Sequence, residues 1–213
     1  MKKSLVIFDM DGTLIDSSLT ISNSINYVRK NLYLEPLPYE QIISKVNDHS
    51  IDPAKYFYAS PNGFTPDHHR WFNEYYTKHH ASELRLYDGV KDMLEWLKDR
   101  GAKIALATNA YHQSTAESLS NFGIDGYFDA VICVDDVKEG KPAPDMLYKI
   151  LDITNIDKES AIFIGDGPRD EEAADNAGID YLMVDWGFTK HDKDKEVITS
   201  VENLKSKLSE LLA

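Results

Sequence analysis

Short apolar runs alternate with helix-like segments over most of this 213-residue chain, and the alternation limits the folds open to it. The apolar runs lie at residues 5–8, 104–107, 130–134, 161–164 and 181–184. From about residue 87 onward, segments with apolar residues at helical spacing separate them. Strands that alternate with helices form parallel sheets covered on both faces. The sequence therefore predicts an α/β protein built on a parallel sheet.

A polar residue follows each run at or close to its carboxyl end. These residues are Asp9, Thr108, Asp135, Asp166 and Asp185. The carboxyl ends of parallel strands meet at one edge, and ligands of open α/β sheets bind there. We expect a binding site at this edge, although ordinary surface turns also carry polar residues.

Residues 16–86 break the alternation. They contain five of the eight prolines, no convincing buried strand, and helix-like stretches at 18–31, 38–46 and 66–82. We predict a helical insertion at 16–86 between the first strand and the rest of the sheet, which leaves 1–15 and 87–213 as the core.

The chain should end in a helix packed on the sheet. Thr199 and Glu202 have capping-box spacing, and Leu204, Leu208 and Leu211 share one helical face.

Composition narrows the possible partners and locations. A net charge of −13 and a pI near 4.9 oppose binding to a nucleic-acid backbone, whereas a small phosphorylated metabolite remains possible beside a bound cation. The apolar runs are far shorter than the roughly 20 residues of a membrane span, and no secretion signal is expected. The single cysteine, Cys133, cannot form an internal disulfide and should be buried. These features favour a cytoplasmic protein, and the sequence does not indicate its oligomeric state.

Asp9 and Asp11 lie where the first run gives way to Gly12 and Thr13. In extended backbone, side chains at i and i+2 point to the same side, about 6.6 Å apart. Asp9 could attack phosphorus to form an acyl phosphate, with Asp11 as the acid and later the base. Two carboxylates this close need a cation, and Mg²⁺ fits because it prefers oxygen ligands. The alternative is a polar Asp-Gly turn after a core strand.

A third acidic motif follows the run at 161–164. Asp166 lies between Gly165 and Gly167 and is the best candidate for a metal ligand. Asp170 could bind the metal or its water. It could instead favour the positive end of a helix that begins at Pro168.

Three further residues suit a phosphoryl group. The Thr108 hydroxyl and backbone N–H groups at Thr108 and Asn109 could hold phosphoryl oxygens, unless the pair only begins a helix. Lys141 could balance the charge of the transferring group, and Pro142 restricts its backbone to extended conformations. A solvated surface lysine is the alternative.

Two histidine pairs lie eleven residues apart in the third helix-like stretch, at His68 and His69 and at His79 and His80. Eleven helical residues span about 16 Å, too far for the two pairs to share one ion. Four aromatic residues between them are expected to pack rather than stack on bases: Trp71, Phe72, Tyr75 and Tyr76.

Taken together, these motifs resemble the haloacid dehalogenase superfamily, in its phosphoglycolate phosphatase and β-phosphoglucomutase branch. Residues 9–14 look like the family's first motif, 108–109 its second, 141–142 its third and 165–170 its fourth. The likeness continues at 140–145 and 173–178 and covers nearly all of the predicted sheet domain.

The resemblance implies a Rossmann-like core, a small helical cap inserted after the first strand, and Mg²⁺ held by the Asp9 carboxylate, the Asp11 main-chain carbonyl and Asp166. Asp9 would be the nucleophile and Asp11 the acid and base. Dehalogenases of the superfamily lack the second acid, so Asp11 favours phosphoryl transfer. The chain departs from the family at Gly167, where a hydroxyl residue is common, and at 43–53, which lacks a glycine-containing signature. Named substrates are therefore not transferred.

The leading hypothesis is a Mg²⁺-dependent phosphatase that hydrolyses a small phosphorylated metabolite through an aspartyl-phosphate intermediate, with the cap closing to exclude water. The alternatives are a phosphosugar mutase and a binding or regulatory protein that has lost turnover. Candidates in the inserted segment for contacting the substrate are Lys45, Asn47, His49 and Arg70.

Overall fold

The computed structural model describes residues 2–46, 48, 50–186 and 197–213, and the chain divides into two compact units. One unit contains Met1–Asp16 and Leu86–Ala213, and the other contains Ser17–Arg85. Each unit is built on a core of its own.

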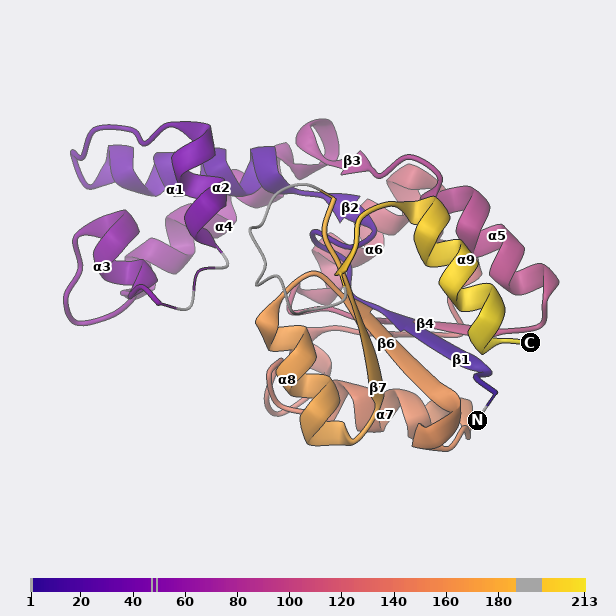
Figure 1. The fold of residues 1–213 in the computed structure, drawn as a ribbon. Helices are drawn as coiled ribbons and strands as arrows, with labels where there is room; N and C mark the ends of the chain where they lie inside the picture. The colour runs from indigo at the N-terminus through magenta and orange to yellow at the C-terminus, as the bar shows by residue number, and fades with distance from the viewer. Residues whose placement is uncertain (1, 47, 49, 187–196) are drawn as a thin grey trace. The chain divides into compact units, whose positions relative to one another are not determined.

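The first unit contains a six-stranded sheet in the order β5-β4-β1-β6-β7-β8, and every strand pair in it is parallel (Figure 1). The strands are β1 Leu5–Phe8, β4 Lys103–Ala107, β5 Ala130–Ile132, β6 Ala161–Gly165, β7 Asp180–Val184 and β8 Val197–Ile198. The parallel sheet and the five predicted strands are confirmed. The β5 strand ends two residues early, because residues 134–136 form a 3₁₀ turn, and β8 was not predicted.

Strand β1 lies inside the sheet, and all four of its residues are buried. Its last residue, Phe8, is in register with Leu106 of β4 and Ile164 of β6. The three strands therefore end side by side, and the residues that follow them are brought to one edge.

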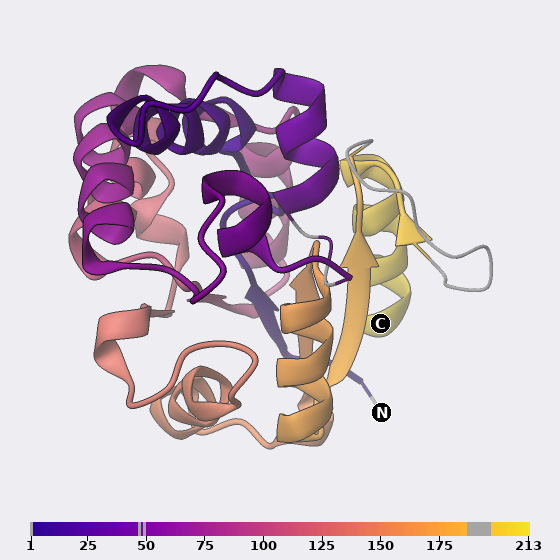
Figure 2. The ribbon, with the colours of Figure 1, turned by 90° about the vertical axis from the view of Figure 1, so that its left-hand side faces the viewer.

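Helices cover both faces of this sheet, as expected for a Rossmann-like α/β fold. They are α5 Val90–Asp99, α6 His112–Phe122, α7 Asp145–Thr154, α8 Pro168–Ala177 and α9 Val201–Leu211. Figures 1 and 2 show α8 beside β6 and β7, and α5 and α9 pack together on the opposite face from α7 and α8. A core of Leu5, Ile7, Phe163 and their neighbours fills the space under α7 and α8.

The terminal helix is confirmed, but its predicted cap is wrong by one residue. Ser200, not Thr199, precedes α9, and its hydroxyl accepts a hydrogen bond from the Asn203 N–H at 3.1 Å. Serine and threonine can both act as caps, so the sequence alone did not separate the two registers. Two of the three predicted leucines, Leu204 and Leu208, are fully buried.

The second unit is helical: α1 Ser18–Asn31, α2 Tyr39–Val46, α3 Pro53–Tyr58 and α4 Pro66–Glu83. Three helices are confirmed, and α3 is additional. It is capped by Asp52, whose carboxylate accepts from two backbone N–H groups, and it starts at Pro53. The predicted packing role of Trp71 and Phe72 is confirmed, because both lie against the core of this unit.

Two short strands, β2 Ile15–Asp16 and β3 Arg85–Leu86, form a separate two-stranded sheet. Among the described residues, no helix has the length and apolar character needed to cross a membrane.

Candidate active site

A tight turn after β1 places Asp9 and Asp11. The Met10 carbonyl accepts hydrogen bonds from Leu14 and Ile15, each at 2.9 Å, so the chain reverses immediately after the strand. Gly12 has a φ of +84°, which disfavours any residue with a side chain. A Cβ there would also overlap the Asp166 carboxylate. The turn therefore lies directly against the residue that follows β6.

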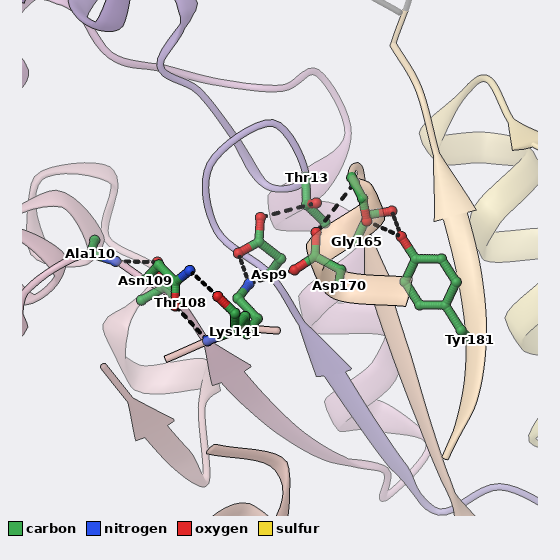
Figure 3. A network of polar contacts seen from close by, with 10 residues as sticks. Asp9, Thr13, Thr108, Asn109, Ala110, Lys141, Gly165, Asp170 and Tyr181 are labelled. Carbon is green, nitrogen blue, oxygen red and sulfur yellow. Dashed lines mark hydrogen bonds and ion pairs between the residues drawn. The ribbon is translucent and has the colours of Figure 1, made fainter. Parts of the chain in front are cut away.

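Asp9 is buried and held from two sides (Figure 3). The Lys141 ammonium donates to Asp9 Oδ1 at 2.5 Å and to Asp170 Oδ1 at 2.6 Å, and only 3% of the Lys141 side chain is exposed. The Thr13 hydroxyl lies 3.5 Å from Asp9 Oδ2. One buried cation thus bridges two buried carboxylates that are 161 residues apart in sequence.

Asn109 fixes the backbone that carries this lysine. Its side-chain amide donates to the Lys141 carbonyl, and its side-chain oxygen accepts from the Lys141 N–H, both at 2.9 Å. The predicted role of Asn109 was phosphate binding, and this contact, which joins residues 32 positions apart, was not predicted. The neighbouring Thr108 is buried, and its hydroxyl accepts from the Ala110 N–H at 3.0 Å. The motif after β4 thus both caps its own turn and aligns Lys141.

Asp170 occupies the helix-start position that was one of its two predicted roles, and it also binds Lys141. It lies in the first turn of α8 behind Pro168, where its Oδ2 accepts from the Gly167 N–H at 3.2 Å, while its Oδ1 binds Lys141. Gly165 is necessary here, because a Cβ would overlap the Asp170 side chain.

Tyr181 was not predicted as part of the site. Its hydroxyl donates to the Gly165 carbonyl at 2.8 Å and so braces the end of β6 (Figure 3). No sequence pattern indicated this contact, because tyrosine is common in strands.

Burial and crowding shift the ionisation of this cluster. Burial raises the pKa of Asp9 from 3.8 to about 7, and the nearby Asp170 adds to the rise, while Lys141 opposes it. Burial, followed by Asp9 and Asp170, raises the pKa of Asp166 well above its usual range. Burial disfavours the Lys141 ammonium, but Asp170 and Asp9 outweigh it and raise its pKa. Lys141 therefore stays charged, but its single positive charge does not balance the nearby carboxylates.

The donor set fits a small divalent cation. Asp9, Asp166 and Asp170 each offer a carboxylate oxygen within 4.8 Å of the others, whereas Lys141 supplies a single positive charge to balance the three acids. Oxygen donors of this kind suit Mg²⁺, and its charge would offset the carboxylate repulsion that adds to the effect of burial on the pKa values of Asp9 and Asp166.

Other predicted residues have different surroundings. Asp135 Oδ1 accepts from the His112 N–H at 2.9 Å at the start of α6, and the Asp185 N–H donates to Ile198 of β8. Cys133 is fully buried, as predicted.

Of the residues proposed to contact substrate, Lys45 pairs with Asp48 at 2.5 Å and Arg70 pairs with Asp67 at 2.9 Å. Asn47 and His49 lie outside the described residues.

Two of the histidines of α4 have structural roles in the helix. His68 Nδ1 accepts from the Thr65 N–H at 3.2 Å at the helix start, and His80 Nδ1 lies 2.8 Å from the Thr77 carbonyl. Within the described part of the chain, no group of metal-binding side chains includes them.

The chain is similar in sequence to known hydrolases. Residues 6–184 match the family model of the haloacid dehalogenase-like hydrolases. The chain is 29% identical to pyrophosphatase PpaX of Bacillus mycoides, over 87% of this chain and 85% of the relative. It is also 29% identical to phosphoglycolate phosphatase of Aquifex aeolicus, over 87% and 86%.

Among solved structures, a predicted phosphatase from Clostridium acetobutylicum shares the fold, with a TM-score of 0.85 and 24% identity over 99% of this chain and 100% of that one. The family match covers strands β4 to β7, most of β1 and all four motifs of the site, and the chain therefore belongs to the haloacid dehalogenase-like hydrolases.

Proposed function

We propose that this protein is a Mg²⁺-dependent phosphatase that cleaves a small phosphorylated metabolite through a phosphorylated Asp9. The observation that carries the proposal is the position of Asp9. It follows a central strand, bonds to Lys141, and shares one small cluster with Asp166 and Asp170. A carboxylate with these neighbours suits nucleophilic attack on phosphorus.

In the first step, a carboxylate oxygen of Asp9 forms a bond to phosphorus as the bond to the leaving oxygen breaks. Asp11, two residues on in the turn, donates a proton to that leaving oxygen. In the second step, Asp11 takes a proton from water, the water oxygen bonds to phosphorus, and Asp9 is released as a carboxylate.

Lys141 has two roles in this proposed mechanism. It holds Asp9 in place, and its positive charge offsets the negative charge of the transferring phosphoryl oxygens. Thr108 and Asn109, at the end of the neighbouring strand β4, are proposed to bind those oxygens through the Thr108 hydroxyl and the backbone. When bound at Asp9, Asp11 and Asp166, Mg²⁺ would neutralise charge on the phosphoryl group and the carboxylates.

The relatives bear on the substrate class. Two of them are named pyrophosphatase and phosphoglycolate phosphatase, and the substrates in both names are small molecules with a phosphoryl group on oxygen. The net charge of −13 favours a small substrate over a polyanion. We place the activity in the cytoplasm, in keeping with a single, buried, unpaired cysteine.

The test is phosphate release from a panel of phosphomonoesters and pyrophosphate with Mg²⁺. Asp9→Asn should reduce turnover at least about 10³-fold while the circular dichroism spectrum stays unchanged. Asp152→Asn, an exposed acid on α7, is the matched control and should retain activity. Substantial turnover by Asp9→Asn would refute the assigned nucleophile. An isomerised sugar phosphate formed without free phosphate would instead identify a mutase.

A further inference from the structure

A second group of metal-binding side chains lies apart from the carboxylate cluster. It contains His112, the first residue of α6, Cys133, which follows β5, and Asp136, at the end of the next 3₁₀ turn. One donor atom from each lies within 4.8 Å of the other two, and His112 Nδ1 is 3.7 Å from Asp136 Oδ2. Among the described residues, only this group and the catalytic carboxylates meet that criterion.

The backbone holds these three residues in place. Asp136 Oδ2 accepts from the Cys133 N–H at 2.9 Å, and the Asp136 N–H donates to the Cys133 carbonyl at 3.0 Å. Asp135 accepts from the His112 N–H, which ties the start of α6 to the same turn. Lys149 of α7 donates to the Asp136 carbonyl at 2.8 Å. The backbone that carries the three ligands is therefore held by hydrogen bonds before an ion binds, and this lowers the entropy cost of binding.

The site is open on one side and buried on the other. The His112 side chain is 61% exposed and that of Asp136 is 30% exposed, whereas Cys133 is fully buried. The imidazole and the carboxylate are thus accessible to solvent, whereas the thiol is not.

A buried hydroxyl supplies an independent sign of a ligand. Thr115, one turn into α6, is fully buried, and within the described structure its Oγ1 has no hydrogen-bond partner at ordinary distance. The Cys133 thiol interacts with this hydroxyl, and a thiolate held by a bound cation would give the hydroxyl a strong acceptor.

We propose that His112, Cys133 and Asp136 form a Zn²⁺ site distinct from the Mg²⁺ site. Thiolate, imidazole and carboxylate are the ligands of tetrahedral zinc, and three protein ligands leave the fourth position to water. The thiol proton is released to solvent when Cys133 binds the ion. Mg²⁺ does not compete, because it prefers an all-oxygen shell.

The test is titration of the whole protein with Zn²⁺, and separately with Co²⁺, in saturating Mg²⁺. Bound Co²⁺ should show the thiolate-to-metal charge-transfer absorption that only a cysteine ligand produces. His112→Gln and Cys133→Ser should each weaken Zn²⁺ binding at least about 10-fold, since loss of supporting residues alone costs 10–100-fold. Cys133→Ser should also abolish the absorption band.

Two controls separate this site from the others. His69→Gln removes an exposed histidine from α4, and Asp9→Asn alters the catalytic cluster; both should leave Zn²⁺ affinity unchanged. Because His112 is exposed, its variant should fold even if Cys133→Ser does not. The proposal is overturned if Co²⁺ produces no thiolate band, or if His112→Gln binds Zn²⁺ as tightly as the unaltered protein.

Discussion

Asp9 should destabilise the metal-free protein at neutral pH, although it is the proposed nucleophile. Its pKa rises from 3.8 to about 7 on folding, mainly through burial. The folded state therefore holds this proton more tightly than the unfolded chain does. The resulting cost to stability is absent below pH 3.8, develops as the pH rises toward about 7, and is complete above it.

The size of this effect follows from the pKa. The difference between about 7 and 3.8, at 1.36 kcal/mol for each pH unit, is about 4 kcal/mol. Asparagine has the shape of a protonated aspartic acid, so Asp9→Asn should remove most of this cost. Asp166 competes for the same proton, and we therefore expect a gain in the free energy of unfolding of about 2–4 kcal/mol at pH 8.

Urea denaturation in EDTA at pH 8 and pH 4 measures this gain. The advantage of Asp9→Asn should fall below about 1 kcal/mol at pH 4, where the carboxyl is protonated in the native protein. It should also shrink in Mg²⁺, which binds the complete set of carboxylates more tightly. Asp152→Asn, which alters an exposed acid, should show no gain. Equal or lower stability of Asp9→Asn at pH 8 without metal would refute the reasoning.

Three further predictions concern the frame of the site. Asn109→Ala removes two hydrogen bonds to the Lys141 backbone and should cost about 1–3 kcal/mol in urea denaturation, with a lower kcat; unchanged kcat would deny the positioning role. Gly12→Ala, at a φ of +84° and against Asp166, should lose at least about 1 kcal/mol of stability and bind Mg²⁺ more weakly in calorimetry. Mg²⁺ binding at pH 6 should release protons, because the raised pKa leaves Asp9 largely protonated there; binding heats that do not depend on the buffer would contradict this.

The sheet was predictable because a strand buried on both faces must be apolar throughout. Strands β1, β4 and β6 are short apolar runs bounded by polar residues, and they occur where the sequence places them. The two-residue strands β2 and β8 have no periodicity to detect, so they were missed. Helix α3 is only six residues long, although Asp52 and Pro53 carried a start signal for it.

The residue types of the candidate site were predictable, but their contacts were not. The order of the motifs brought Asp9, Asp166 and Lys141 to one edge of the sheet. Nothing in local sequence indicates that the Asn109 side chain bonds to a backbone 32 residues away, or that Tyr181 braces Gly165. Such contacts depend on how loops from different strands meet, which strand and helix patterns do not record.

The central claim is a covalent bond between phosphorus and Asp9, and trapping that bond tests it most directly. The protein would be quenched with acid during turnover, reduced with borohydride and digested, and residue 9 read by mass spectrometry. Reduction converts an aspartyl phosphate to homoserine, so the account predicts homoserine at position 9 only when substrate is present. Turnover that leaves residue 9 as unmodified aspartate, or that marks another acid, would contradict it.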